Sequence, residues 1–161
     1  MATVPITWDA NMDYPPAFAG MLADDMFTDK ETVPCGVTTQ PFGTVVATVA
    51  ATGISVLPHA ANPIQGIAIH DHRFSGRITT QEGYVQYDAM SVIGRGRIWA
   101  RASGVCTKDA VAKFDAATGI FADAALVTLP NARFLSTALT IPGIESGSQL
   151  IVLVELHHPM A

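Results

Sequence analysis

Residues 111–122 read VAKFDAATGIFA and form the most clearly patterned unit of the chain. Two short runs, Val111 to Phe114 and Ile120 to Ala122, flank a loop that ends in Gly119. A glycine in this place can adopt the left-handed backbone conformation that such a loop needs, because it has no Cβ atom. The stretch therefore predicts a β-hairpin.

Short β-branched runs separated by Gly, Pro, Asn or Asp continue this pattern from Phe42 onward. Such punctuation is typical of an all-β sandwich or barrel. The last run, Leu150 to Val154, is apolar at every position. It fits a central strand covered on both faces, or a strand whose outer face meets another subunit. The predicted strands cover residues 43–49, 54–57, 66–69, 89–93, 96–101, 111–114, 120–122, 133–135 and 149–155.

The composition limits both the fold and the partners. A chain of 161 residues and 17.0 kDa suits one domain, since domains cluster near ~100 to 150 residues. A hydrophobic fraction of 49% and a mean hydropathy of +0.32 exclude a disordered chain. Charged residues make up only 14%, against roughly 25% in an ordinary domain, so part of the surface is expected to be covered in an assembly. A net charge of −5 disfavours nucleic-acid binding.

The first thirty residues differ from the rest of the chain. Trp8, Tyr14 and Phe18 stand among prolines and small residues, and acids gather after them. We interpret residues 1–30 as an extended N-terminal arm and residues 31–161 as the β-domain.

The sequence contains no recognisable targeting signal, membrane span or CxxC motif. The N-terminus carries acids and prolines where a secretion signal would carry Lys or Arg and then an apolar run. Residues 32–70 contain no Asp, Glu, Lys or Arg, yet polar residues, Pro and Gly interrupt them, so no ~20-residue membrane span remains. Cys35 and Cys106 lack CxxC spacing, which favours reduced cysteines that pack as small hydrophobes. One or two helical turns are predicted over Ala17 to Met26.

The motif His70-Asp71-His72 is the most tempting candidate for metal chemistry. Histidines two positions apart on a strand point to the same face and could hold one metal ion, with His157 and His158 available from the last strand. Cupin barrels use such a pair, but Gly66 lies too close upstream for the cupin pattern and Glu82 lies beyond the place of the third ligand. We therefore favour surface histidines at a strand end and assign no metal.

Motifs for covalent and phosphate chemistry are missing from the sequence. There is no GxSxG nucleophile elbow, and Gly94-Arg95-Gly96 lacks both the further glycines and the following helix of a phosphate-binding loop. Active sites assembled from distant residues leave no such motif. An enzyme is disfavoured, and no cofactor is assigned.

Alternation along residues 92–101 separates two kinds of side chain on one strand. Small and apolar residues occupy one face. The residues on the other face are Arg95, Arg97, Trp99 and Arg101. Arg and Trp are enriched at binding hot spots, and Arg can pair bidentately with carboxylates, so this face is interpreted as a partner-contact surface. The alternatives are a solvated face on which arginine stems shield Trp99, and a thin platform for single-stranded nucleic acid.

Seven short segments succeed one another in a distinctive order: Pro16–Asp24 (PAFAGMLAD), Pro41–Val46 (PFGTVV), Ile64–Ile69 (IQGIAI), Val92–Trp99 (VIGRGRIW), Phe114–Gly119 (FDAATG), Ala132–Phe134 (ARF) and Ile151–Leu156 (IVLVEL). In this order they resemble the structural cement, or capsid decoration, proteins of tailed bacteriophages. The resemblance covers the chain from about Pro16 to Leu156. Its specificity rests on the order, because each segment is short and apolar.

The resemblance implies a β-barrel or jelly-roll-like subunit that binds the outer surface of the phage capsid and bridges neighbouring major capsid subunits. It implies a homo-oligomer, with a dimer favoured over a trimer, made in the bacterial host cytoplasm and located in the virion. It implies no catalysis, cofactor, nucleic-acid partner or membrane partner. The arm residues Trp8, Tyr14 and Phe18 are then expected to contact the capsid or a second copy. A small-ligand or metal-binding cupin-like barrel and a phage tail or baseplate component remain as alternatives.

Overall fold

The architecture of the protein comes from a computed structural model that describes residues 17–24, 28–56, 62–71, 73, 83–142 and 148–158. Its strands, in chain order, are β1 (Asp29–Pro34), β2 (Thr39–Pro41), β3 (Val45–Thr48), β4 (Ser55–Val56), β5 (Ile64–Ala68), β6 (Gly83–Val85), β7 (Ala89–Ala102), β8 (Val111–Phe114), β9 (Val127–Phe134), β10 (Leu139–Pro142) and β11 (Ser148–His157). No α-helix occurs among the described residues.

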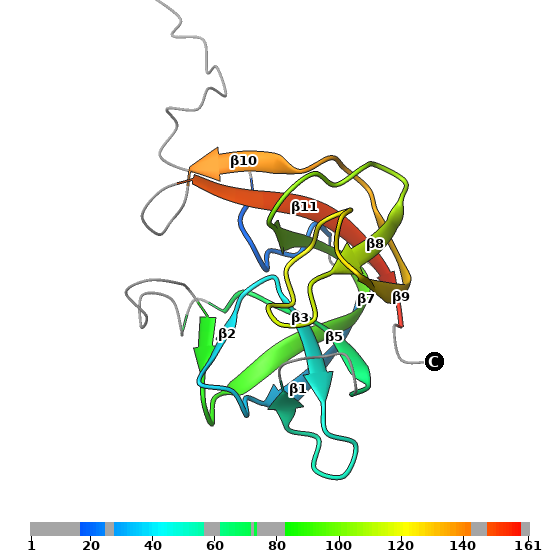
Figure 1. The fold of residues 1–161 in the computed structure, drawn as a ribbon. Helices are drawn as coiled ribbons and strands as arrows, with labels where there is room; N and C mark the ends of the chain where they lie inside the picture. The colour runs from blue at the N-terminus through cyan, green and yellow to red at the C-terminus, as the bar shows by residue number, and fades with distance from the viewer. Residues whose placement is uncertain are drawn as a thin grey trace, which may run out of the picture.

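The strands form one large curled sheet and one small sheet (Figure 1). The order across the large sheet is β4-β3-β5-β7-β11-β9-β8, with β1 also paired to β7 and β10 also paired to β11. The small sheet pairs β2 with β6. The predicted class, an all-β single-domain sandwich or barrel, is confirmed. The jelly-roll topology stays a prediction.

Strand β7 is the longest strand and lies in the middle of the large sheet, and other segments pair with both of its edges. On one edge, β1 covers its first half, ending with Asp29 opposite Arg95. Strand β11 continues the same edge, from His157 opposite Arg95 to Leu150 opposite Ala102. On the other edge, β5 pairs only at the first half of β7.

The residues that precede β1 complete the second edge of β7. The amide of Trp99 donates to the carbonyl of Met21 over 2.9 Å, and the amide of Gly20 donates to the carbonyl of Trp99 over 2.7 Å. Ala17 and Ala19 are buried. The prediction of helical turns over residues 17–26 is wrong for residues 17–24, because they form a single turn, closed by the Met21 amide donating to the Phe18 carbonyl over 3.1 Å, and pair through their backbone with β7. The division into arm and domain at residue 30 stays a prediction.

Strand β11 occupies the central place that its apolar sequence predicts. It lies between β7 on one side and β9 and β10 on the other. Ile151, Val152 and Val154 are fully buried, whereas Leu150 and Leu153 are half-buried. The main core cluster that β11 joins also contains Val45, Ile67, Ile93, Ile98, Phe114, Phe121, Leu129 and Phe134.

The predicted hairpin over residues 111–122 is confirmed in its loop but not in its second strand. Gly119 has a φ of 71°, and its amide donates to the carbonyl of Asp115 over 2.8 Å. Phe121 forms an isolated antiparallel bridge with Phe114 of β8, and the Ala122 amide donates to the Lys113 carbonyl over 3.1 Å, whereas the regular strand partner of β8 is β9. The side chain of Phe121 is buried, with its ring centroid 6.0 Å from that of Phe134.

Several strand limits differ from the predicted ones. The predicted strands 89–93 and 96–101 form the single strand β7, because Gly96, with a φ of 130°, carries the backbone through the Gly94-Arg95-Gly96 segment. The predicted strand 133–135 is the end of the longer β9. Strands β1, β2, β6 and β10 were not predicted. They are short, and β1 reads DKETVP with mostly exposed side chains, so it lacks the apolar alternation that marks a half-buried strand.

Cys35 and Cys106 are free and buried, as predicted. They belong to different core clusters. Burial raises the pKa of both thiols, that of Cys106 to about 11. No helix among the described residues is long and apolar enough to cross a membrane.

Candidate partner-contact surface

The predicted face of β7 is present. Arg95 and Arg97 are exposed and Trp99 and Arg101 are half-buried, whereas Ile98 and the two alanines of this half of the strand are buried. This alternation arises from the pleat of a strand, which sends successive side chains to opposite faces. The neighbours of the four residues differ, so each is considered in turn.

Arg97 belongs to an ion cluster centred on Glu155. Arg97 Nε donates to Glu155 Oε1 over 3.2 Å, and Arg133 Nε donates to Glu155 Oε2 over 2.8 Å. Asp24 approaches Arg97 to 3.6 Å. Burial by itself raises the pKa of Glu155, but the hydrogen bonds from Arg133 and Arg97 outweigh it and hold the pKa below its ordinary value. The cluster ties β7, β9 and β11 together.

Arg95 lines a groove beside this cluster. The groove has a volume of about 350 Å³, and its charged lining comes from Asp24, Arg95, Arg97 and Glu155, with His157 at its side. Within the part of the chain that the structure describes, Arg95 forms no ion pair and no side-chain hydrogen bond. Its guanidinium is therefore available to a group from outside.

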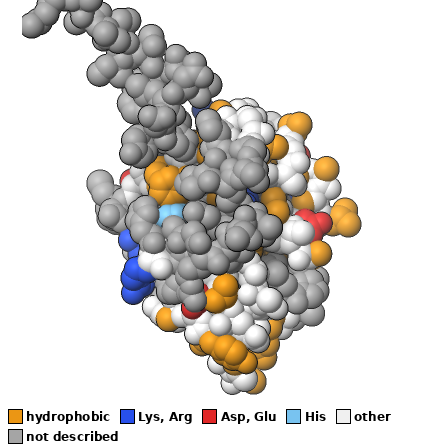
Figure 2. Space-filling model, turned by 90° about the vertical axis from the view of Figure 1, so that its left-hand side faces the viewer, with side chains coloured by type: hydrophobic (Ala, Val, Ile, Leu, Met, Phe, Trp, Pro, Cys, Tyr) orange, Lys and Arg blue, Asp and Glu red, His pale blue; other side chains and the backbone are white. Residues whose placement is uncertain are grey.

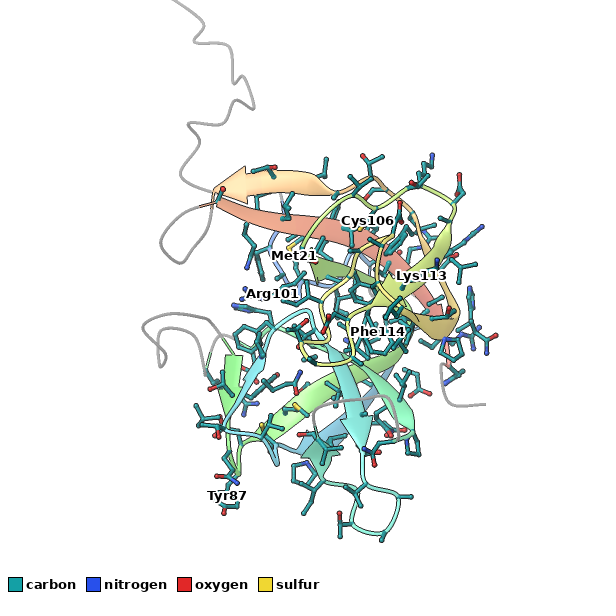
Figure 3. All side chains as sticks on the ribbon, viewed as in Figure 1. Met21, Tyr87, Arg101, Cys106, Lys113 and Phe114 are labelled. Atoms are coloured by element: carbon teal, nitrogen blue, oxygen red, sulfur yellow. The ribbon has the colours of Figure 1, made fainter. Side chains whose placement is uncertain are left out.

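Trp99 and Arg101 are held by the lead-in segment and the loop after β2. The ring of Trp99 packs against a small buried cluster that includes Ala17, Ala19 and Ile151. Arg101 Nε donates to the carbonyl of Phe42 over 2.9 Å. Figure 3 labels Arg101 and also Met21, whose carbonyl accepts the Trp99 amide. These two residues therefore fix the end of β7 that faces the lead-in segment.

Phe18 is half-buried and packs against the β-domain. Its ring contacts His70 at a centroid distance of 4.6 Å. The ring of Phe42 lies 4.5 Å from His70 and 5.1 Å from Tyr84, again between centroids. His70 is thus packed among aromatic rings. Burial raises the pKa of Tyr84 to about 12.

Some predicted positions lie outside the described residues, namely Trp8, Tyr14 and His72. Among the residues that the structure does describe, no three His, Cys, Asp or Glu side chains come together as metal ligands would.

A comparison with protein families gives one decisive result. The model of the family described as "Structural cement protein (E217 gp24/Pam3 gp6)" matches residues 7–156. The chain belongs to the structural cement protein family. This cement protein therefore has a structural role in a bacteriophage capsid.

The fold of the cement protein agrees with this assignment. A chain in the solved structure of the capsid of Myoviridae Phage XM1 is similar, with a TM-score of 0.62 and 15% sequence identity. The similarity covers 94% of this chain and 97% of that one. No curated protein matches the sequence.

Two features of the cement protein were not predicted from its sequence. Glu155 and Arg133 stand in separate strands far apart along the chain, and only the register of β11 with β9 places them opposite each other. Tyr87 precedes β7 and has a φ of 74°, a conformation that no sequence pattern marks. For Glu155, a weak signal was available, since it is the single acid in the otherwise apolar run of the last strand.

Proposed function

We propose that the protein binds the outer surface of a phage capsid and holds neighbouring major capsid subunits together against internal pressure. The family match over residues 7–156 carries this proposal. A protein that binds only the assembled shell stabilises that state by mass action. A low content of charge, 14% of residues, suits a surface that other proteins cover. The proposal includes no catalytic step and no cofactor.

The face of β7 is the contact surface that we propose for one capsid subunit. Arg95 is the residue best placed for this contact, because its guanidinium can take a carboxylate of the capsid subunit in a bidentate pair. Arg97, Trp99 and Arg101 present their exposed parts beside it, while their contacts within the chain keep the face in shape. Groups that are held before binding lose less entropy when the partner docks.

Co-sedimentation with empty shells of the same phage tests the function directly. We expect saturable binding and a higher temperature of shell disruption. Arg95→Glu is expected to weaken binding at least tenfold, and Lys108→Glu, the same change at an exposed site on the turn before β8, is expected to leave it unchanged. Parent protein that stays in the supernatant would refute the function. Equal binding by the Arg95→Glu variant would refute only the proposed face.

The aromatic residues near the N-terminus form the second part of the proposal. Trp8 and Tyr14 are proposed to contact the capsid or a second copy, and Phe18 to anchor the segment through its ring contact with His70. Deletion of residues 1–16 should then reduce shell binding or self-association. Unchanged binding and unchanged oligomer size would remove these residues from the interface.

Self-association and position in the particle complete the proposal. We propose a homodimer in preference to a trimer, and analytical ultracentrifugation of the purified protein distinguishes the two. Antibody labelling of virions distinguishes a capsid protein from a tail or baseplate component. Label on the tail together with no binding to shells would assign the protein to the tail.

A further inference from the structure

The turn before β7 holds an aromatic residue in a conformation that suits it poorly. The amide of Asp88 donates to the carbonyl of Val85 over 3.0 Å, which closes a turn with Tyr87 at its third position. Tyr87 has a φ of 74°. A positive φ at this position of a turn favours Gly or Asn, and other L-residues there cost roughly 1–2 kcal/mol.

The ring of Tyr87 makes no contact among the described residues that would stabilise the fold. The residue is 86% exposed. Its side chain forms no hydrogen bond and no ring contact within the part of the chain that the structure describes. The backbone, in contrast, is firmly held, because the amide of Tyr87 donates to the carbonyl of Cys35 over 2.8 Å and Asp88 Oδ2 accepts from the amide of Val85. The ring is therefore presented to solvent on a fixed base.

The surroundings of Tyr87 form an end of the molecule that is almost free of charge. The side-chain amide of Gln86 donates to the carbonyl of Gly36. Gly36 in turn packs against the side chain of Ile54, which lies in the turn between β3 and β4. The described residues that these contacts bring together, Cys35, Gly36, Ile54 and Gln86, carry no charge, and the neighbouring Asp88 is half-buried and accepts from the amide of Val85. Figure 2 shows hydrophobic side chains gathered at the lower end of the molecule, where Figure 3 places Tyr87.

We propose that Tyr87 is an anchor that inserts into an uncharged, apolar pocket of a major capsid subunit. This inference rests on the proposed function. The end projects, since Gly53 of the β3–β4 turn has open space around it and residues 50–54 are all exposed. Two identical projecting ends that meet across a two-fold axis offer each other no pocket for the ring, whereas the proposed function supplies a capsid subunit as partner. The capsid subunit, rather than a second copy, is therefore the partner.

Tyr87 also lies far from Arg95, which gives the proposal a geometric consequence. Tyr87 lies two residues before β7, and the six steps of the strand from Ala89 to Arg95, at about 3.3 Å per residue, cover about 20 Å. A protein that joins two capsid subunits needs two separate contact surfaces. The Arg95 face and the Tyr87 end supply one each.

The test compares Tyr87→Gly with the parent protein in shell co-sedimentation and in thermal unfolding. Glycine accepts the positive φ, so we expect a Tm about 2–4 °C higher, with unchanged oligomer size. Loss of the ring should weaken shell binding at least tenfold. Tyr87→Phe should bind like the parent, because it keeps the ring. The matched control is Leu126→Ala, which removes another side chain that is 96% exposed and should leave binding unchanged.

Each outcome decides one point. A parent protein that binds shells and a Tyr87→Gly variant that binds equally well would overturn the anchor and leave the proposed function in place. A variant that changes oligomer size would overturn the choice of the capsid subunit as partner. A parent protein that fails to bind shells would overturn the proposed function and the anchor together. Weakened binding by a variant with a raised Tm supports the anchor, because a folding defect cannot produce that combination.

Discussion

Replacing Glu155 with glutamine tests the ion cluster that joins β7, β9 and β11. Glu155 is only 8% exposed and accepts hydrogen bonds from Arg97 and Arg133, with Arg133 Nη2 also 2.7 Å from Oε2. A buried hydrogen bond to a charged group contributes up to ~3 kcal/mol. Because the two arginine side chains are about half exposed, we assign ~0.7 kcal/mol to each of the three contacts that they make with the carboxylate. We therefore expect Glu155→Gln to lower the free energy of unfolding by about 2 kcal/mol at pH 7.

The same variant makes a prediction about pH. The pKa of Glu155 in the folded protein lies below its ordinary value of 4.5, because the arginine hydrogen bonds favour the ionised form. A carboxyl group with a lowered pKa stabilises the fold above its unfolded pKa and loses this contribution as the pH falls through the folded pKa. The difference in stability between parent and variant should be full at pH 7 and shrink once the pH falls below 4.5.

Urea denaturation at a series of pH values measures both effects. In thermal unfolding, the expected 2 kcal/mol corresponds to a Tm lower by about 4–8 °C. Double-mutant cycles with Arg133→Ala and Arg97→Ala should give the larger coupling for Arg133, because it makes two contacts to the carboxylate. A stability difference below about 0.5 kcal/mol, or one that stays constant from pH 7 to pH 3, would refute the reasoning.

Three further predictions concern glycines, cysteines and a buried tyrosine. Gly43 and Gly53 both have positive φ, but a Cβ at Gly43 would lie 2.9 Å from the amide nitrogen of Gly20, whereas nothing lies within 4 Å at Gly53. Gly43→Ala should cost about 3 kcal/mol and Gly53→Ala about 1 kcal/mol in urea denaturation, and equal losses would contradict the crowding argument. Cys35 and Cys106 should resist alkylation at pH 8 until urea unfolds the protein, because burial raises the pKa of both thiols. Mass spectrometry measures the labelling, and fast labelling of the native protein would count against this prediction. In a spectrophotometric titration, the phenol of Tyr84 should ionise near pH 12, so this phase should be missing from a Tyr84→Phe variant. If the variant keeps the phase, another tyrosine produces it.

Where the sequence pattern depends on a strand's own pleat, it predicted the structure well. The face of β7 that carries Arg95 and Arg97 results from alternation within one strand. The central place of β11 results from an apolar run that no half-exposed strand could carry. The left-handed Gly119 results from the steric needs of a short loop.

Features that depend on pairing between distant segments could not be predicted in this way. Residues 17–24 mix small residues with Phe18, Met21 and Leu22, a composition that does not distinguish a helix from other structure, and only the unoccupied edge of β7 decides between them. Strand β1 is stabilised by its hydrogen bonds to β7 and not by a buried face, so its charged sequence gives no signal. Arg97 illustrates the limit for the candidate site, because its position was predicted while its carboxylate partner came from β11.

The two-sided pairing of β7 has a consequence for the synthesis of the protein. One half of β7 is completed by residues 148–157, which the ribosome adds after it. At about 5–20 residues per second, the 55 residues between the end of β7 and the end of β11 take about 3–11 s to appear. During that time the second half of this edge of β7, from Gly96 to Ala102, has no partner within its own chain, because β1 covers only the first half. On a polysome that makes many copies at once, the same edge is open to strands of neighbouring nascent chains, so productive folding depends on how quickly the C-terminal strand arrives.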